Sequence, residues 1–274
     1  MKLEMTSRSV DMQFLLFLLV GVCWIANASA QPTGADIMLE QKNRHDVAQE
    51  FTEEKMTLRS AKGKVKERRM ITYSMKPENG GAKTLIKFLE PSSIHNVGLL
   101  TWEQSDANED DQWLYLPASK KIKRISGGGK ANPFMGTDFS FEDMRPESIT
   151  THEYEVLGEE EVDGHLCWIV QALPATKQEK KASGYSKRIF WIRQDIYFTV
   201  KTEFYNRKKK LAKLGVYGNL EEVGDGAWRS NEISMKNLKR KTQTILVTQS
   251  RDLASPMNKS TFETQALKRP PIIK

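Results

Sequence analysis

The sequence predicts a mainly β protein built on one large antiparallel sheet, preceded by a single helix. After residue 50, apolar and polar residues alternate with a period of two, and turn signals recur at hairpin spacing with hardly any helical period between them. Successive hairpins without β–α–β spacing indicate antiparallel pairing. Because strand twist accumulates, a sheet of roughly ten strands tends to curl and to enclose one of its faces.

The first 30 residues are interpreted as an export signal and not as part of the fold. The run Phe14–Ala26 is uncharged and apolar but too short for a confident membrane span. Ala28 and Ala30 supply the small-x-small pattern of a signal-peptidase site. We therefore predict cleavage after Ala30 and one exported domain over residues 31–274, with a retained N-terminal anchor as the alternative.

The elements of this domain follow in order. Thr33 is placed to cap a helix whose first turn contains Asp36 and whose short apolar stripe includes Ile37 and Met38. Residues 53–76 then predict two strands joined by the turn SAKGK. Further strands or hairpins are expected over residues 82–91, 98–104, 111–126, 153–173, 185–195, 197–206, 210–223, 227–238 and 241–253.

The charge of the chain favours anionic partners. Lys and Arg number 42 against 35 Asp and Glu, which gives a net charge of +7. Phospholipid headgroups or acidic proteins fit this balance better than nucleic acid, which an exported protein rarely meets. The run Arg207–Lys210, with Lys213, is either a contact for such partners or a solvated hairpin tip. Without the leader Cys167 stands alone, so no internal disulfide is predicted.

One segment combines flexibility with large apolar side chains. In SGGGKANPFMGTDFSFEDM, residues 126–144, the glycines Gly127, Gly128 and Gly129 raise the entropy cost of ordering the chain. Four large apolar side chains follow at once: Phe134, Met135, Phe139 and Phe141. Two interpretations stay open. The segment forms a gate at the mouth of a cavity with the glycines as its hinge, or it packs the core beneath a connecting loop.

The residues that catalysis or metal binding would need show no recognisable spacing. The four histidines are isolated and form no HExxH pattern, and no G-x-S-x-G nucleophile motif is present. The carboxylates Asp138 and Asp143 have no marked substrate near them in the sequence. We therefore expect no enzyme, no metal and no cofactor. An envelope hydrolase stays a minor alternative, because distant carboxylates and histidines can converge in space.

Several strings of the sequence fit together as a family signature. The chain resembles the LolA-like outer-membrane lipoprotein-sorting proteins, in the branch found alongside RND-type exporters. The most specific strings are WLYLP at residues 113–117 and FMGTDFSFED at residues 134–143. The others are residues 85–103, 183–192 and 201–213. The longer glycine loop and the string NRKKK at residues 206–210 depart from the usual pattern and put loop geometry in doubt, not the fold.

The resemblance implies an incomplete antiparallel β-barrel, curved around a hydrophobic cavity and covered by helices or loops. It also implies a periplasmic carrier without catalytic residues, which ferries an acylated lipoprotein or another lipid towards the outer membrane. Its partners would be that cargo, the membrane surface in passing, and an RND-type inner-membrane transporter. The alternative is a docking module of such an exporter with no cargo of its own.

A lipid carrier must offer an apolar cavity, because an acyl chain in water costs about 0.8 kcal/mol per CH₂ group. The large apolar side chains of the strands and the glycine segment are the candidates for lining it, although core packing is the plainer explanation for each. A register error of one residue would exchange the inner and outer faces of a strand. The candidates for lipid binding are Phe88, Trp102, Trp113, Tyr115, Phe134, Met135, Phe139, Phe141 and Trp191.

Overall fold

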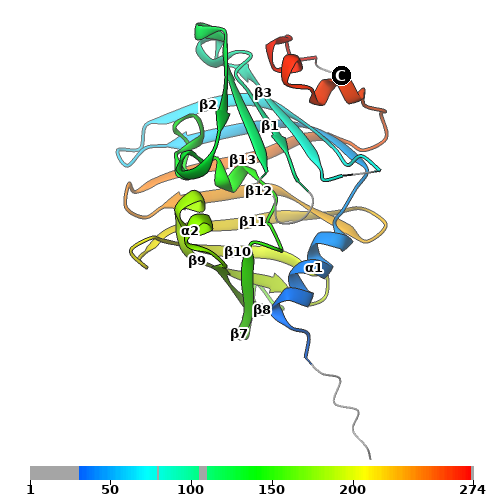
Figure 1. Cartoon of the computed structure of the whole chain (residues 1–274). Coiled ribbons are helices and arrows are strands. Elements are labelled where there is room, and N and C mark those ends of the chain that lie inside the picture. The colour runs from blue at the N-terminus through cyan, green and yellow to red at the C-terminus, as the bar shows by residue number, and fades with distance from the viewer. Residues whose placement is uncertain (1–30, 79, 105–109, 273–274) are drawn as a thin grey trace, which may run out of the picture. The chain divides into compact units, whose positions relative to one another are not determined.

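The computed structural model describes residues 31–78, 80–104 and 110–272; the predicted leader and its cleavage site lie outside them. The described residues form one antiparallel sheet of 13 strands with two short α-helices (Figure 1). The helices are α1 (Gly34–Arg44) and α2 (Lys177–Ser183). The strands are β1 (Gln49–Arg59), β2 (Val65–Met75), β3 (Lys83–Glu90), β4 (Gly98–Trp102), β5 (Asp111–Leu116), β6 (Lys121–Ile125), β7 (His152–Val162), β8 (His165–Pro174), β9 (Tyr185–Arg193), β10 (Phe198–Asn206), β11 (Leu211–Gly224), β12 (Ala227–Asn237) and β13 (Thr242–Asp252).

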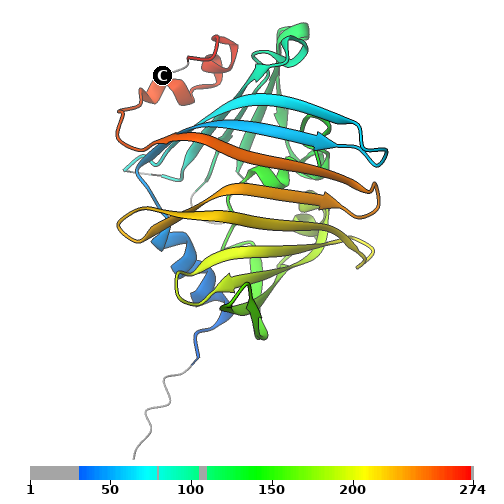
Figure 2. The same ribbon diagram turned by 180° about the vertical axis from the view of Figure 1, so that it is seen from behind.

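The strand order is that of two meanders joined by one long-range pair. It runs β6-β5-β4-β3-β2-β1-β13-β12-β11-β10-β9-β8-β7, so the pairing of β1 with β13 connects the first meander to the second. The sheet does not close, because β6 and β7 remain its two edges. Figure 2 shows its strands curving around one side. The prediction of a mainly β, incomplete antiparallel barrel with an N-terminal helix is confirmed.

Helix α1 packs against the inner face of the strands at the β7 edge. Thr33 caps it as predicted, because its hydroxyl accepts a hydrogen bond from the amide of Asp36 at 3.2 Å and its amide donates to the Asp36 carboxylate at 3.1 Å. Ile37 and Met38 are fully buried with side chains of β8 and β9. A Cβ atom at Gly34 would lie 2.8 Å from the carbonyl carbon of Tyr154, so the helix approaches β7 too closely for any larger residue.

The connection between β6 and β7, residues 126–151, lies on the inner face and is built largely from 3₁₀ turns. The turn Gly127–Ala131 packs on α2, and the left-handed Gly184 ends α2 at a point where a Cβ would lie 2.7 Å from that of Ala131. The sequence interpretation did not include α2, although Thr176 carries an N-cap signal and accepts a bond from the Glu179 amide.

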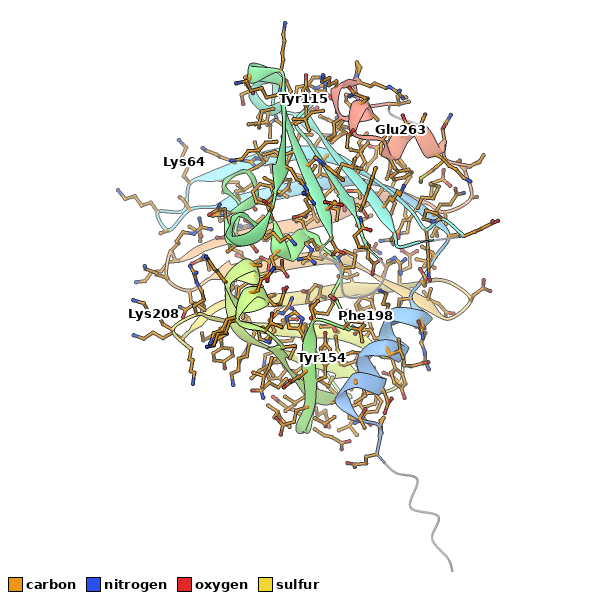
Figure 3. The ribbon with its side chains drawn as sticks, in the orientation of Figure 1. Lys64, Tyr115, Tyr154, Phe198, Lys208 and Glu263 are labelled. Atoms are coloured by element: carbon orange, nitrogen blue, oxygen red, sulfur yellow. The ribbon has the colours of Figure 1, made fainter. Side chains whose placement is uncertain are left out.

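The outer face near the β6 edge is covered by the C-terminal segment, which was not anticipated either. Its two 3₁₀ turns, Lys259–Phe262 and Thr264–Lys268, bury Phe262 and Leu267 against β2–β5. In Figure 3, Glu263 lies on this segment beside the part of the sheet that carries Tyr115. Both faces of β2–β5 are therefore covered, which explains why these strands carry large apolar residues at both parities.

A candidate binding cavity beneath the connecting segment

A cavity of about 390 Å³ lies between the inner face of β9–β12, helix α1 and the connecting segment. Phe198, on β10, lies close to α1 in Figure 3. The volume falls within the range of small-molecule sites, roughly 300–1,000 Å³. Much of its lining is apolar: Met38, Phe139, Ile149, Phe190, Phe198, Phe204, Ile233 and Met235.

Buried charged residues line another part of this cavity. The Arg188 guanidinium, from β9, is 2.6 Å and 2.9 Å from the two Glu147 carboxylate oxygens and lies 2.8 Å from the His152 ring nitrogen Nε2. Burial and the positive charge of Arg188 lower the pKa of His152 to about 3, so that ring is neutral. Burial also raises the pKa of Glu147, although Arg188 opposes the rise. The lining is therefore less apolar than the sequence led us to expect.

A second ion-pair cluster holds the connecting segment to the end of β4–β5. Arg145 donates to Asp110 at 2.9 Å and to Glu142 at 2.7 Å. Burial alone would lower the pKa of the Arg145 guanidinium. The negative charges of Glu142 and Asp110 have the larger effect, so the pKa is raised. Arg145 and Glu142 both line the cavity, so this cluster forms part of its polar wall.

A smaller cavity of about 210 Å³ continues along the inner face and shares Ile233 with the first. Glu50 accepts hydrogen bonds there from Arg229 at 2.8 Å and from Arg251 at 2.6 Å. Glu54 has no cation at that distance and accepts from the Thr72 hydroxyl at 2.7 Å. Burial raises the pKa of Glu54 to about 7.

Residues 138–149 of the connecting segment cover the cavity and are called its roof; two aspartates fasten this roof to the sheet. The carboxylate of Asp138 accepts hydrogen bonds from Arg240 at 2.7 Å and from Thr244 at 2.9 Å. The carboxylate of Asp143 accepts one from the Tyr185 hydroxyl at 2.6 Å and is paired with the ammonium of Lys213. The same ammonium donates to the carbonyl of Asp138. The roof is thus tied to β9, β11 and β13 by charge-assisted bonds.

Phe139 stands between the cavity and the outside. It lines the cavity and also a large groove of about 1130 Å³ that opens between the β10–β11 and β12–β13 hairpins. The ring packs with Tyr185, Phe204 and Met235. One aromatic side chain on the roof therefore separates the inner space from a surface groove.

Four other candidates from the sequence pack together under β1–β5. Phe134 is fully buried between Phe88 and Phe141, with ring centroids 5.7 Å and 5.6 Å apart. Met135 packs against the same cluster, and its carbonyl accepts a bond from Arg68 at 2.9 Å. These side chains fill the inner face here and line neither cavity.

The remaining four candidates lie on the outer face, away from the cavity. Trp102, Trp113 and Tyr115 belong to the cluster beneath the C-terminal segment, where the Trp102 indole donates to the Phe262 carbonyl at 2.8 Å. Trp191 lies on the outer side of β9, with the Lys201 ammonium 3.6 Å from its ring centroid. The sequence could not assign these faces, because both parities of the strands are apolar.

The three glycines occupy one 3₁₀ turn. The amide of Gly129 donates to the Ser126 carbonyl at 3.0 Å, and the turn leans on α2. Only Gly127 adopts a left-handed conformation, with φ of +50°. A hinge at Gly127, Gly128 and Gly129 stays a prediction, because no motion of the segment is observed.

The sequence did not single out Arg188 and Glu147, and it named Asp138, Asp143 and Lys213 without assigning them to a cavity. Glu147 gave no sequence signal, since it is one charge among several in its neighbourhood, and Arg188 stood in a family-like string, residues 183–192, without being singled out. Asp138, Asp143 and Lys213 did lie within the family-like strings, and that was the signal that could have identified them. Among the described residues, no group of three or more His, Cys, Asp or Glu side chains is arranged to hold a metal ion.

A solved structure decides the family. The crystal structure of a "putative outer membrane lipoprotein-sorting protein domain" from Vibrio parahaemolyticus is 31% identical, with a TM-score of 0.81, and the match covers 86% of this chain and 98% of that one. The chain belongs to the family of this lipoprotein-sorting domain. A family model described as an uncharacterized protein also matches residues 80–269.

This chain is similar to two further crystal structures. A DUF1329 family protein from Desulfovibrio piger is 27% identical over 85% of this chain and 97% of that one, with a TM-score of 0.79. A LolA superfamily protein from Nitrosomonas europaea is 17% identical over 86% and 99%, with a TM-score of 0.67, and establishes the LolA-like fold alone. No curated protein matches the chain. Within residues 31–78, 80–104 and 110–272, no helix is long and apolar enough to span a membrane.

Proposed function

We propose that this protein is a periplasmic carrier that binds the acyl part of a lipoprotein or another lipid and transfers it towards the outer membrane. The observation that supports the proposal most directly is the cavity on the inner face, which has an apolar lining and a roof separate from the sheet. The similarity to the Vibrio domain described as lipoprotein-sorting supports the same class of cargo. The protein works by binding and release, and no bond of the cargo is made or broken.

The mixed lining fits an amphipathic ligand better than a pure hydrocarbon. An acyl chain would lie against Phe190, Phe198 and Phe204, where burial removes its CH₂ groups from water. The polar end of the cargo would lie near Arg188 and Glu147, which are already paired. Because that pair satisfies itself, the empty cavity carries no uncompensated charge, and cargo is not held by one dominant ion pair.

Entry and release require the roof to move, and Phe139 is the side chain that we expect to move. It separates the cavity from the surface groove, and the bonds of Asp138 and Asp143 hold it in the closed position. The glycines before the roof would serve as the hinge. We place the chain in the branch associated with RND-type exporters, whose inner-membrane transporter would supply or accept the cargo.

The deciding experiment combines native mass spectrometry with lipid extraction on protein purified from its own periplasm. A stoichiometric, chemically unchanged acylated species is expected. A fluorescent fatty acyl probe should then bind the lipid-free protein. Ile233→Trp places a larger side chain in the cavity and should weaken probe binding at least about tenfold. Val216→Trp, on an exposed position of the neighbouring strand β11, is the matched control and should leave binding unchanged.

The alternatives predict different results. A docking module without cargo would be recovered empty and would take up no probe. An envelope hydrolase would release a cleaved lipid. Equal probe binding by Ile233→Trp and the unsubstituted protein would place the ligand outside this cavity and contradict the proposed site.

A further inference from the structure

Three neighbouring hairpin tips at one end of the sheet form a strongly basic surface, which we call the basic rim. They are residues 60–64, 207–210 and 238–241, which join β1 to β2, β10 to β11 and β12 to β13. The six strands are contiguous in the sheet, so the tips stand in a row. The three tips contain no aspartate or glutamate. Their cations are Lys62, Lys64, Arg207, Lys208, Lys209, Lys210, Lys239, Arg240 and Lys241.

The cations of the basic rim are exposed to solvent at one end of the strands. Lys64 and Lys208, from the first and second of these tips, both project from the same side of the molecule in Figure 3. All nine residues are exposed. Arg240 has a structural task as well, because it is paired with Asp138 on the roof.

The opposite end of the same sheet has the opposite character. The turns at residues 194–197 and 225–226 contain Asp195 and Asp225 and no lysine or arginine. Both aspartates are exposed. Among these five hairpin turns, positive charge is therefore gathered at one end of the strands, which a merely solvated surface does not require.

Each hairpin of the basic rim also exposes one aliphatic side chain. Val65 is 48% exposed, Leu211 38% and Leu238 44%, and each directly follows or lies within its cationic tip. Exposed aliphatic groups beside lysines are the composition of surfaces that lie in the headgroup region of a bilayer. A soluble polyanion or an acidic protein face would pair with the cations and would gain little from three separated aliphatic side chains.

We propose that the basic rim docks on the surface of an anionic lipid bilayer. The lysines and arginines would meet lipid phosphates, and Val65, Leu211 and Leu238 would enter the boundary between headgroups and acyl chains. Docking in this way sets the groove beside Phe139, which opens between two of the three hairpins, against the membrane. The proposal goes beyond cargo carriage, because an empty protein would dock equally well.

Vesicle sedimentation tests the proposal with the exported protein. Vesicles of phosphatidylcholine with phosphatidylglycerol are compared with phosphatidylcholine alone, at low and high salt. Arg207→Gln, Lys208→Gln and Lys210→Gln are combined, and Lys209 is kept because it holds the left-handed position of the turn, with φ of +60°. Since each cation near such a surface contributes about fivefold to the affinity, the triple variant should bind anionic vesicles roughly a hundredfold more weakly.

The matched control removes three exposed cations from the C-terminal segment, at Lys259, Lys268 and Arg269. It lowers the net charge of the chain equally and should reduce vesicle binding far less. Circular dichroism of both variants verifies that each is folded. Equal loss in both variants would mean that net charge alone attracts the protein, and the docking surface would be refuted.

A second pair of variants separates a bilayer from other anionic partners. Leu211→Gln with Leu238→Gln should weaken binding to anionic vesicles at high salt, where screening leaves the apolar contribution dominant. Leu157→Gln with Leu166→Gln, on β7 and β8, is the control, and these leucines are 48% and 49% exposed. If dextran sulfate binds as tightly as vesicles and the aliphatic variant behaves as the unsubstituted protein, the rim meets a soluble or protein-borne anion and the bilayer proposal fails.

Discussion

The two halves of the inner face differ in how the space inside the curved sheet is occupied. Beneath β1–β5 the chain folds its own segment into the curve of the sheet, and Phe134 with Phe141 occupies the space against Phe88. Beneath β9–β12 the roof stands further off, and a cavity of about 390 Å³ remains. One half is a filled core, and the other encloses a cavity.

The side chains of the two halves differ as well. The cluster that fills the first half, around Phe134, consists of apolar side chains, whereas the open half contains Arg188, Glu147 and the Asp143–Lys213 pair. The half that is not filled by side chains can contain buried polar groups, provided that each has a hydrogen-bond or ion-pair partner. Aromatic residues therefore occur in both halves of the inner face, and buried ion pairs are what distinguish the cavity.

The largest effect is expected from emptying the filled half. Phe134→Ala should lower the free energy of unfolding by about 4 kcal/mol, because the ring is fully buried between two other rings and leaves a void. Denaturant unfolding measures the loss. The affinity of the folded fraction for an acyl probe should stay the same, since Phe134 lines neither cavity.

Phe139→Ala provides the contrast on the same segment, because Phe139 does line the cavity and the groove. Its loss should change the rate of probe entry as well as stability. If both variants changed stability alone, the segment would be core throughout and the gate would be refuted. If Phe134→Ala changed probe affinity, the division of the inner face into a filled and an open half would be wrong.

The sheet itself was predictable from local patterns. Alternation and turn residues located the hairpins, and the Thr33 cap located α1, because these signals depend only on neighbouring residues. The pairing of β1 with β13 brings together residues about 190 positions apart in the chain, from Phe51–Asp252 to Arg59–Gln243, and no local pattern encodes it.

The site was much less predictable. Trp102 and Trp113 carry no sequence mark that distinguishes the outer face from the inner one, because the C-terminal segment that covers them lies about 150 residues away. Arg188 and Glu147 are partners only after β9 and the roof have met. The segment left a gate or a core open for Phe139 and Phe134 alike, and only the structure separates them, because Phe139 lines the cavity and Phe134 does not.

Breaking the charge pair of the open half should have the next largest effect. Arg188→Met leaves Glu147 buried without its cation, and we expect a loss of about 3 kcal/mol in the free energy of unfolding at pH 7. The double variant Arg188→Met, Glu147→Leu should recover most of it, because no unpaired charge remains. A double variant as unstable as the single one would show that the pair is not the source of the stability.

The smallest effect concerns Glu54, which lies between the two halves, and its sign depends on pH. Burial raises the pKa of Glu54 to about 7, above the value of about 4.5 that it has when exposed, so the folded state holds this proton more tightly than the unfolded state. The stability that Glu54 provides is complete below about pH 4.5 and is lost as the pH rises through 7. The free energy of unfolding of Glu54→Gln, which cannot ionise, should therefore match that of the unsubstituted protein at pH 4.5 and exceed it by on the order of 2 kcal/mol at pH 8, as measured by urea unfolding.

Glu161→Gln, on an exposed position of β7, is the control, because it removes the same charge without burial, and its stability should not change with pH in this way. A Glu54→Gln variant that is less stable at pH 8 would mean that Arg251 stabilises the ionised carboxylate of Glu54. The middle of the inner face would then contain a stabilising charge pair, as the open half does.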